Sequence, residues 1–123
     1  MIVQPVSQID PITFGYSSPI KTLFKKGKLP KVHYGFYGEE LKVKSTTIEH
    51  LKCVKDGGKT TLDNVVLTSA NKNQERGTRP LIEVLNWEFV GKYLEQFRNV
   101  AISGFNGNEY IQGILRTINK LIN

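Results

Sequence analysis

The residues best able to do chemistry lie between Glu49 and Asn73. Glu49 stands directly before His50, and Asn64 follows the glycine-rich stretch Asp56-Gly57-Gly58. Imidazole accepts protons near neutral pH without a large pKa shift, and carboxylate and amide oxygens are ligands of hard divalent cations. A lone histidine is most often an ordinary surface residue, and a lone asparagine most often belongs to a turn or a helix cap. Their joint spacing is therefore more informative than any one of these residues alone.

The stretch TTIEHLKCVKDGGKTTLDNVVLTSANKNQERG, residues 46–77, resembles the HNH endonuclease family. The core of that family runs from an acid–histidine pair through a glycine-rich loop and an asparagine to an asparagine or histidine on a helix. The resemblance covers about a quarter of the chain closely, and the flanking segments resemble small phage-type HNH nucleases less specifically. It implies an α+β fold with a ββα-metal (HNH, His-Me finger) core at about residues 43–79, an N-terminal extended basic arm and C-terminal packing helices, in one HNH nuclease-like domain over residues 1–123.

The resemblance also implies a role for each residue of the pattern. His50 matches the base that activates water, and Asn64 matches the residue that supports it by holding the local backbone. Glu49 and Asn73 match the ligands of a divalent ion, Mg²⁺ or Mn²⁺, that stabilises the leaving oxygen. Removing either ligand is expected to weaken metal binding and to leave the fold nearly intact. The implied function is metal-dependent endonucleolytic hydrolysis of nucleic-acid phosphodiester bonds, with DNA as the expected substrate.

Two features depart from the common family pattern. The first residue of the pair is usually aspartate, whereas Glu49 has one more methylene, which disfavours the near-ideal geometry that Mg²⁺ demands and favours Mn²⁺. Many family members bind a structural zinc through two Cys-x-x-Cys pairs, but the corresponding helix positions here are Ser69 and Lys72. We expect no structural zinc, and we expect apolar packing to replace its contribution to folding. The residues expected to pack are Leu81, Leu85, Trp87, Phe89, Tyr93 and Phe97.

Two strands and a short helix are expected to position the site. Residues 43–51 are rich in β-branched side chains and predict a strand that ends near the acid–histidine pair. A turn follows at the paired glycines, and residues 60–69 then predict a second strand. Residues 69–77 predict a helix with Ser69 as N-cap and Gly77 at its end.

Further helices are expected towards the C-terminus. Apolar residues recur at spacings of three and four within residues 80–86, 88–100 and 106–123, as they do on the buried faces of amphipathic helices. Residues 1–19 contain three prolines and no helical period, so they predict an extended arm with turns.

The charge of the chain favours a polyanionic partner. Lys and Arg number 17 against 11 Asp and Glu, for a net charge of +6. The densest basic patch, residues 21–31, precedes an aromatic, glycine-rich stretch, and this combination suits contact with nucleic acid. Arg76 is expected to clamp a phosphate from the same helix face as Asn73, while His33 is expected to have no catalytic role. The lysines expected to contact nucleic acid are Lys21, Lys25, Lys26, Lys28 and Lys31.

Cysteine content and hydropathy bear on the compartment. Cys53 is the single cysteine, and one isolated thiol fits a reducing compartment. No apolar stretch approaches the roughly 18 residues that a membrane helix needs. We therefore expect a cytoplasmic protein of a bacterial or phage-infected host cell with no membrane partner. Two alternatives stay open: a catalytically weak or inactive HNH-fold protein that binds DNA, and a phage packaging or assembly protein that acts beside a packaging motor.

Overall fold

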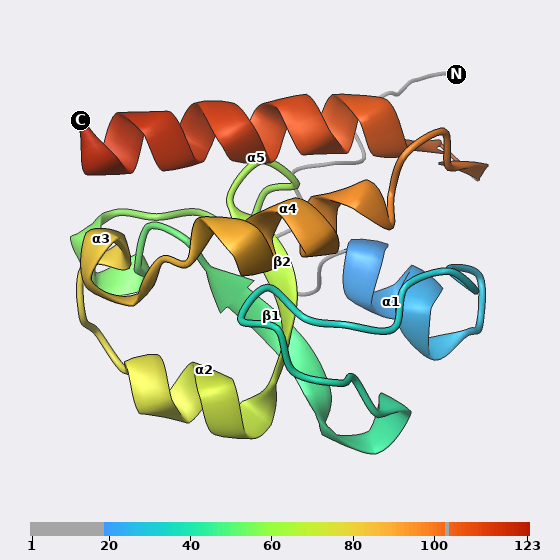
Figure 1. Ribbon diagram of the computed structural model, residues 1–123, viewed down its shortest axis with the longest axis horizontal. Coiled ribbons are helices and arrows are strands. Elements are labelled where there is room, and N and C mark those ends of the chain that lie inside the picture. Colours follow the sequence, from blue (N-terminus) through green and yellow to red (C-terminus); the bar gives the residue numbers. More distant parts are fainter. Residues whose placement is uncertain (1–18, 103) are drawn as a thin grey trace, which may run out of the picture.

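A two-stranded antiparallel hairpin followed by a short helix lies at the centre of the protein (Figure 1). The computed structural model describes residues 19–102 and 104–123. Strand β1 (Thr46–His50) pairs with β2 (Val65–Ser69) so that His50 faces Val65, and α2 (Ala70–Arg76) follows β2 directly. The predicted α+β class is confirmed.

The first strand is shorter than the sequence predicts. Residues 43–45 form a short 3-10 turn, η2 (Val43–Ser45), instead of extended chain. The Thr46 hydroxyl donates to the Lys42 carbonyl at 2.6 Å and so closes this turn at the point where β1 begins. Local side-chain hydrogen bonding of this kind offers the backbone an alternative to a sheet ladder.

Both predicted ends of α2 are confirmed. The Ser69 hydroxyl accepts from the Lys72 backbone N–H at 3.2 Å, which satisfies one of the donors left unpaired at the start of the helix. At the other end, the Gly77 N–H donates to the Asn73 carbonyl, and Gly77 has a positive φ of 57°. Glycine adopts this conformation without the steric cost that other residues meet.

Helices pack around the hairpin on several sides. In Figure 1, α5 runs along the top of the molecule above α4, and the hairpin lies between α1 and α3. Asn86 and Asn106 cap α4 and α5 through their side-chain oxygens. No helix in the described ranges is long and apolar enough to cross a membrane. The remaining elements are α1 (Pro19–Lys25), η3 (Val54–Asp56), α3 (Leu81–Val84), α4 (Trp87–Glu95), β3 (Ala101–Ile102), β4 (Phe105–Asn106) and α5 (Gly107–Ile122).

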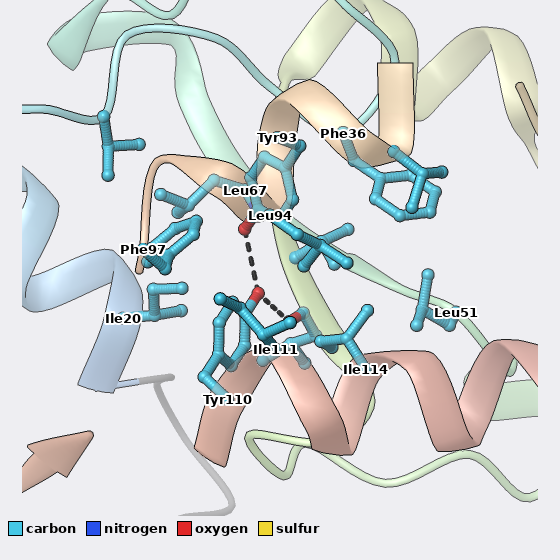
Figure 2. Close-up of a cluster of buried hydrophobic side chains, with 14 of the residues drawn as sticks. Ile20, Phe36, Leu51, Leu67, Tyr93, Leu94, Phe97, Tyr110, Ile111 and Ile114 are labelled. Carbon is cyan, nitrogen blue, oxygen red and sulfur yellow. Dashed lines mark hydrogen bonds between the residues drawn. The ribbon is translucent and has the colours of Figure 1, made fainter. Parts of the chain in front are cut away.

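The buried hydrophobic residues form a cluster between β2 and helices α1, α3, α4 and α5 (Figure 2). The rings of Tyr93, Phe97 and Tyr110 meet edge to face, with centroids 4.9 Å apart for Phe97 and Tyr110. Leu81 is buried with them, as expected. Trp87, in contrast, is 51% exposed and does not pack in the core. Its neighbours at the start of α4, residues 86 and 88, are exposed as well.

Two buried tyrosines extend the hydrogen bonding of β2 into the core. The Leu67 N–H donates to the Tyr93 hydroxyl oxygen at 2.9 Å, and the Tyr110 hydroxyl donates to the Val65 carbonyl at 2.7 Å. The two hydroxyl oxygens are 2.8 Å apart. Because the Tyr110 proton is used on Val65, Tyr93 is the donor in the bond between the two tyrosines.

The basic segment before the hairpin begins with a helix, which corrects the expected extended basic arm. Ile20 and Phe24 are buried and stand four residues apart, so one face of α1 packs against the strands while its lysines face outward. Pro19 starts the helix, a position that tolerates its missing N–H. The arm expected over residues 1–19 otherwise lies outside the described residues.

Candidate functional site

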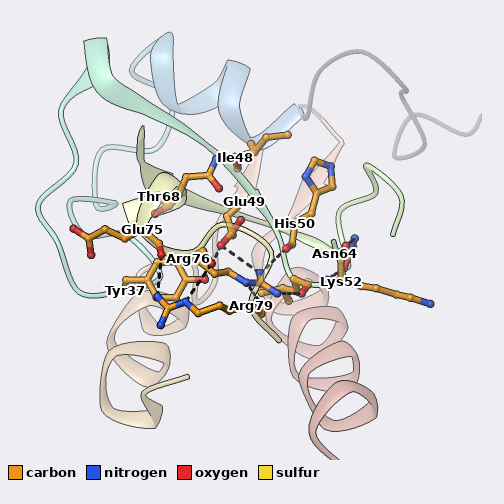
Figure 3. A network of polar contacts seen from close by, with 12 residues as sticks. Tyr37, Ile48, Glu49, His50, Lys52, Asn64, Thr68, Glu75, Arg76 and Arg79 are labelled. Atoms are coloured by element: carbon orange, nitrogen blue, oxygen red, sulfur yellow. Dashed lines mark hydrogen bonds and ion pairs between the residues drawn. The ribbon is translucent and has the colours of Figure 1, made fainter. Parts of the chain in front are cut away.

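His50 ends β1 with its ring directed away from the side chain of Glu49 (Figure 3). Successive residues of a strand point to opposite faces, so the adjacent acid and histidine are separated by the sheet. The ring Nε2 of His50 lies 2.8 Å from the Thr60 hydroxyl oxygen. Partial burial lowers the pKa of His50, and the charge of Glu49 opposes this shift. The neutral ring, which can accept a proton, therefore persists to lower pH than in an exposed histidine.

Asn64 fixes the loop between the two strands. Its side-chain oxygen accepts from the Lys52 N–H at 2.9 Å, and its amide donates to the carbonyls of Lys52 and Lys59 at 3.2 and 2.9 Å. One buried side chain thus ties together the two ends of the loop that carries Thr60. These contacts are of the backbone-holding kind that the sequence pattern led us to expect of Asn64.

The paired glycines allow the loop to fold back on itself. Gly57 has a φ of 94°, in the left-handed region that glycine favours. A Cβ atom built on Gly58 would lie 1.8 Å from the Lys52 carbonyl oxygen, so no larger residue fits there without moving the backbone. Gly58 thus allows the chain to pack against the Lys52 backbone just before it reaches Thr60.

Glu49 is buried on the other side of the sheet from His50. Its Oε2 accepts from the Tyr37 hydroxyl at 2.6 Å and lies 3.3 Å from Nη1 of Arg76, while only 6% of the Glu49 side chain is exposed. Burial and the hydrogen bond to Glu49 raise the pKa of Tyr37, so its hydroxyl stays a donor. One oxygen of this carboxylate is therefore committed to a buried cation and a phenol.

Arg76 is a buried tie between α2 and the end of β1. It donates to the carbonyls of His50, Leu51 and Arg79 at 2.7, 2.9 and 2.9 Å, and it is 3% exposed (Figure 3). The expectation that Arg76 clamps a phosphate is corrected, because its donors face protein acceptors and not solvent. A guanidinium with this set of partners holds the strand end that carries His50 against the helix.

Asn73 lies on the same face of α2 as Arg76, as its spacing predicts. Its amide donates to the Ile48 carbonyl at 3.2 Å, and the residue is half-buried. Within the described residues, no hydrogen bond or ion pair engages Oδ1 of Asn73 or Oε1 of Glu49. These are two hard oxygen donors from neighbouring parts of the hairpin and the helix.

The donor set fits a hard divalent cation by type. Mg²⁺ and similar ions are often held by one or two protein oxygens together with waters and substrate phosphates. The charge of Arg76 at 3.3 Å and the low exposure of Glu49 both lower the affinity for a second cation there. No group of three or more His, Cys, Asp or Glu residues suited to a metal occurs among the described residues.

The lysines expected to contact nucleic acid lie on α1 and the loop that follows it. Lys25, Lys26, Lys28 and Lys31 are exposed and Lys21 is half-exposed. Within residues 19–102 and 104–123, no ion pair engages them. The structure joins none of them to His50, Glu49 or Asn73 by a hydrogen bond.

Tyr37 and Thr60 are contacts of the site that the sequence reasoning missed. Tyr37 stands in an aromatic stretch before the hairpin, and nothing in its spacing relates it to Glu49. Thr60 was recognisable only as a residue just after the glycine turn.

Comparisons with protein-family models, with curated proteins and with solved structures gave no match.

Proposed function

We propose that the protein is a metal-dependent endonuclease of the HNH type that hydrolyses nucleic-acid phosphodiester bonds with His50 as the base. The observation that carries the proposal is the position of His50 at the end of β1, beside the loop that Asn64 fixes. A hairpin followed directly by α2 supports a ββα-metal arrangement for this part of the chain.

His50 takes the proton of the attacking water. The Thr60 hydroxyl can accept Nε2–H, which leaves Nδ1 as the nitrogen that accepts the proton. As the water oxygen bonds to phosphorus, the bond from phosphorus to the leaving oxygen breaks. The nearby Glu49 charge stabilises the imidazolium that forms, since it favours the protonated ring.

Glu49 and Asn73 would hold the divalent ion through Oε1 and Oδ1. When bound, such an ion supplies stabilisation of the negative charge on the leaving oxygen. Arg76 and Tyr37 hold the other oxygen of Glu49, so they orient the carboxylate.

A second candidate is an HNH-like fold that binds nucleic acid without cutting it. The specific observation in its favour is the Glu49–Arg76 pair, because the carboxylate already has a cationic partner and is nearly buried. In such a protein the pair would serve only to join α2 to β1. A role beside a partner such as a phage packaging motor belongs to the same class of function.

Cleavage of supercoiled plasmid with Mn²⁺, with Mg²⁺ and with EDTA separates the two candidates. We expect metal-dependent nicking by the wild-type protein, and we expect His50→Ala to slow it about a hundredfold to ten-thousandfold, the usual effect of losing a general base. Folding and DNA affinity should be retained, and added imidazole should restore part of the rate.

His33→Ala is the matched control. His33 is exposed and is held through its backbone N–H, which donates to the Gln96 side chain, so removing its ring should change cleavage little. Equal losses in the two variants would mean that the effect is on folding and would remove His50 as the base. Absence of cleavage by the wild-type protein with either metal would favour the binding protein.

A further inference from the structure

A groove of about 1180 Å³ lies between α5 and the loop that joins β1 to β2. In Figure 1 this loop passes directly beneath α5. The wall formed by α5 carries polar residues at intervals of four, which places them on one ridge of the helix. They are Asn108, Gln112, Arg116 and Lys120, and all are exposed.

Gly113 lets the loop approach the helix. A Cβ atom built on Gly113 would lie 3.2 Å from the Cβ of Asp63, so a larger residue would push the loop away. Glycine in a helix interior is unfavourable compared with alanine. The close approach of Asp63 accounts for its presence in the middle of α5.

Positive charge predominates along the groove. Lys52 and Lys59 line it from the loop, and Arg116 and Lys120 line it from α5. Among the described residues, the side chains of these four cations form no hydrogen bond or ion pair, whereas Arg98 pairs with Glu95 on the surface. The acids that line the groove are Asp63 and Glu109, so four cations face two anions.

The groove adjoins His50 through the loop. Lys52 follows His50 by two residues and extends from the same end of β1 (Figure 3). On the returning part of the loop, Lys59 precedes Thr60, whose hydroxyl lies against the His50 ring. Asn64 binds the backbone of both lysines and so fixes their positions relative to the strand end.

We propose that this groove binds the phosphodiester backbone of a nucleic-acid strand and directs it towards His50. Arg116 and Lys120 contact phosphates from one side, and Lys52 and Lys59 contact them from the other. This inference rests on the proposed function for the role of His50, but the binding itself can be measured separately.

The size and lining of the groove favour a polymer backbone over a small ligand. Its volume exceeds the range of roughly 300–1,000 Å³ that is usual for small-molecule pockets. Tyr110 is the aromatic residue among the described lining residues, and at 3% exposure it offers no surface for a base to stack on. Binding should therefore depend on phosphate charge and show little sequence preference.

The test is fluorescence anisotropy with a labelled single strand and the corresponding duplex, in EDTA and over a range of salt concentrations. The double variant R116Q/K120Q should flatten the slope of log affinity against log salt by about 1.4 for the single strand and about 1.8 for the duplex, the values for two phosphates that are no longer neutralised. Glu109→Gln should raise affinity, because it removes an anion from the groove. The control K44Q/K92Q loses the same charge from exposed positions that do not line the groove. Equal slopes for R116Q/K120Q and the control would overturn the proposal.

Plasmid cleavage by the same variants separates this inference from the proposed function. A flatter salt slope for R116Q/K120Q without any cleavage by the wild-type protein would support the groove as a binding site and contradict the proposed nuclease activity. Cleavage by the wild-type protein, together with a salt slope for R116Q/K120Q equal to that of the control, would retain the nuclease and remove the groove as its binding site. Displacement of the labelled strand by polyglutamate as effectively as by unlabelled nucleic acid at matched ionic strength would overturn a nucleic-acid occupant.

Discussion

Glu49 and His50 are neighbours in sequence but meet different surroundings. The alternation of β1 places Glu49 against Arg76 and Tyr37 in the interior, while His50 stays half-exposed beside Thr60. The structure argues against the expectation that Glu49 can be replaced with the fold nearly intact, because its carboxylate is the counterion of a buried guanidinium. At this residue a structural role overlaps with the proposed role as a metal ligand.

Glu49→Gln should destabilise the protein by roughly 3–5 kcal/mol, since removal of one partner leaves the other charge buried and unpaired. Urea denaturation followed by circular dichroism measures the change. Glu75→Gln is the control, because Glu75 pairs with Lys72 on the surface, where an ion pair contributes about 0–1 kcal/mol. Similar midpoints for the two variants would show that the buried pair does not stabilise the fold.

If His50 is the base, as we propose, its lowered pKa predicts the pH dependence of cleavage. The active form of a base is the deprotonated one, so the single-turnover rate should rise with pH and reach half its maximum below about 6.5, the ordinary histidine value. Because the folded pKa lies below the unfolded one, protonation also favours unfolding. The stability associated with His50 is present above about pH 6.5 and is lost as the pH falls. A flat rate profile between about pH 5 and 8 at saturating metal would exclude His50 as the titrating group.

At the scale of elements, β2 forms hydrogen bonds to helices α4 and α5 on the side away from β1. Tyr93 of α4 and Tyr110 of α5 form these two bonds, and burial raises the pKa of both hydroxyls, so they remain protonated donors. The donor order from Leu67 through Tyr93 and Tyr110 to Val65 uses each proton once. The position of β2, and with it the loop that adjoins His50, is thereby coupled to the packing of both helices.

Tyr110→Phe should cost about 1–3 kcal/mol, because the Val65 carbonyl and the Tyr93 hydroxyl would each lose a buried partner. Thermal and urea unfolding provide the measurement. Tyr34→Phe removes the same group from a residue that is 52% exposed, and it should change stability little. A Tyr110→Phe protein as stable as the wild type would mean that water or a shifted side chain replaces the missing bond.

The local signals of the sequence predicted the elements better than the contacts between them. Ser69 and Gly77 bounded α2 correctly, because capping depends on residues within one turn. The helix α1 was missed, since its seven residues are too few to repeat the apolar spacing of Ile20, Leu23 and Phe24. The role of Arg76 was predicted wrongly for a different reason. Its acceptors, the carbonyls of His50 and Leu51, lie about 25 residues away along the chain. The spacing of residues along a helix carries no information about such a distant contact.

At the scale of the whole molecule, two surfaces carry cations that we expect to contact phosphates. One comprises Lys25, Lys26 and Lys28 on α1 and the loop after it, and the other is the groove beside α5.

Replacing Lys25, Lys26 and Lys28 with alanine tests the first surface. If these lysines bind phosphates, the slope of log affinity against log salt should flatten by about one unit for each phosphate that is no longer bound. The control K44Q/K92Q should leave the slope close to that of the wild type. A triple variant with an unchanged slope would show that these lysines are only solvated charges of α1.

The hydrogen-bonding partners along the outer sides of the hairpin also bear on how the protein behaves in concentrated solution. Asn73 and Arg76 occupy outward carbonyls of β1, at Ile48 and His50, while Tyr93, Tyr110 and the Phe36 N–H occupy outward groups of β2. A strand of another molecule that approached either side would find these groups already taken, and unpaired strand edges are where chains join into aggregates. Substitutions that loosen α2 or α5 should accordingly produce intermolecular sheet and precipitation before complete unfolding.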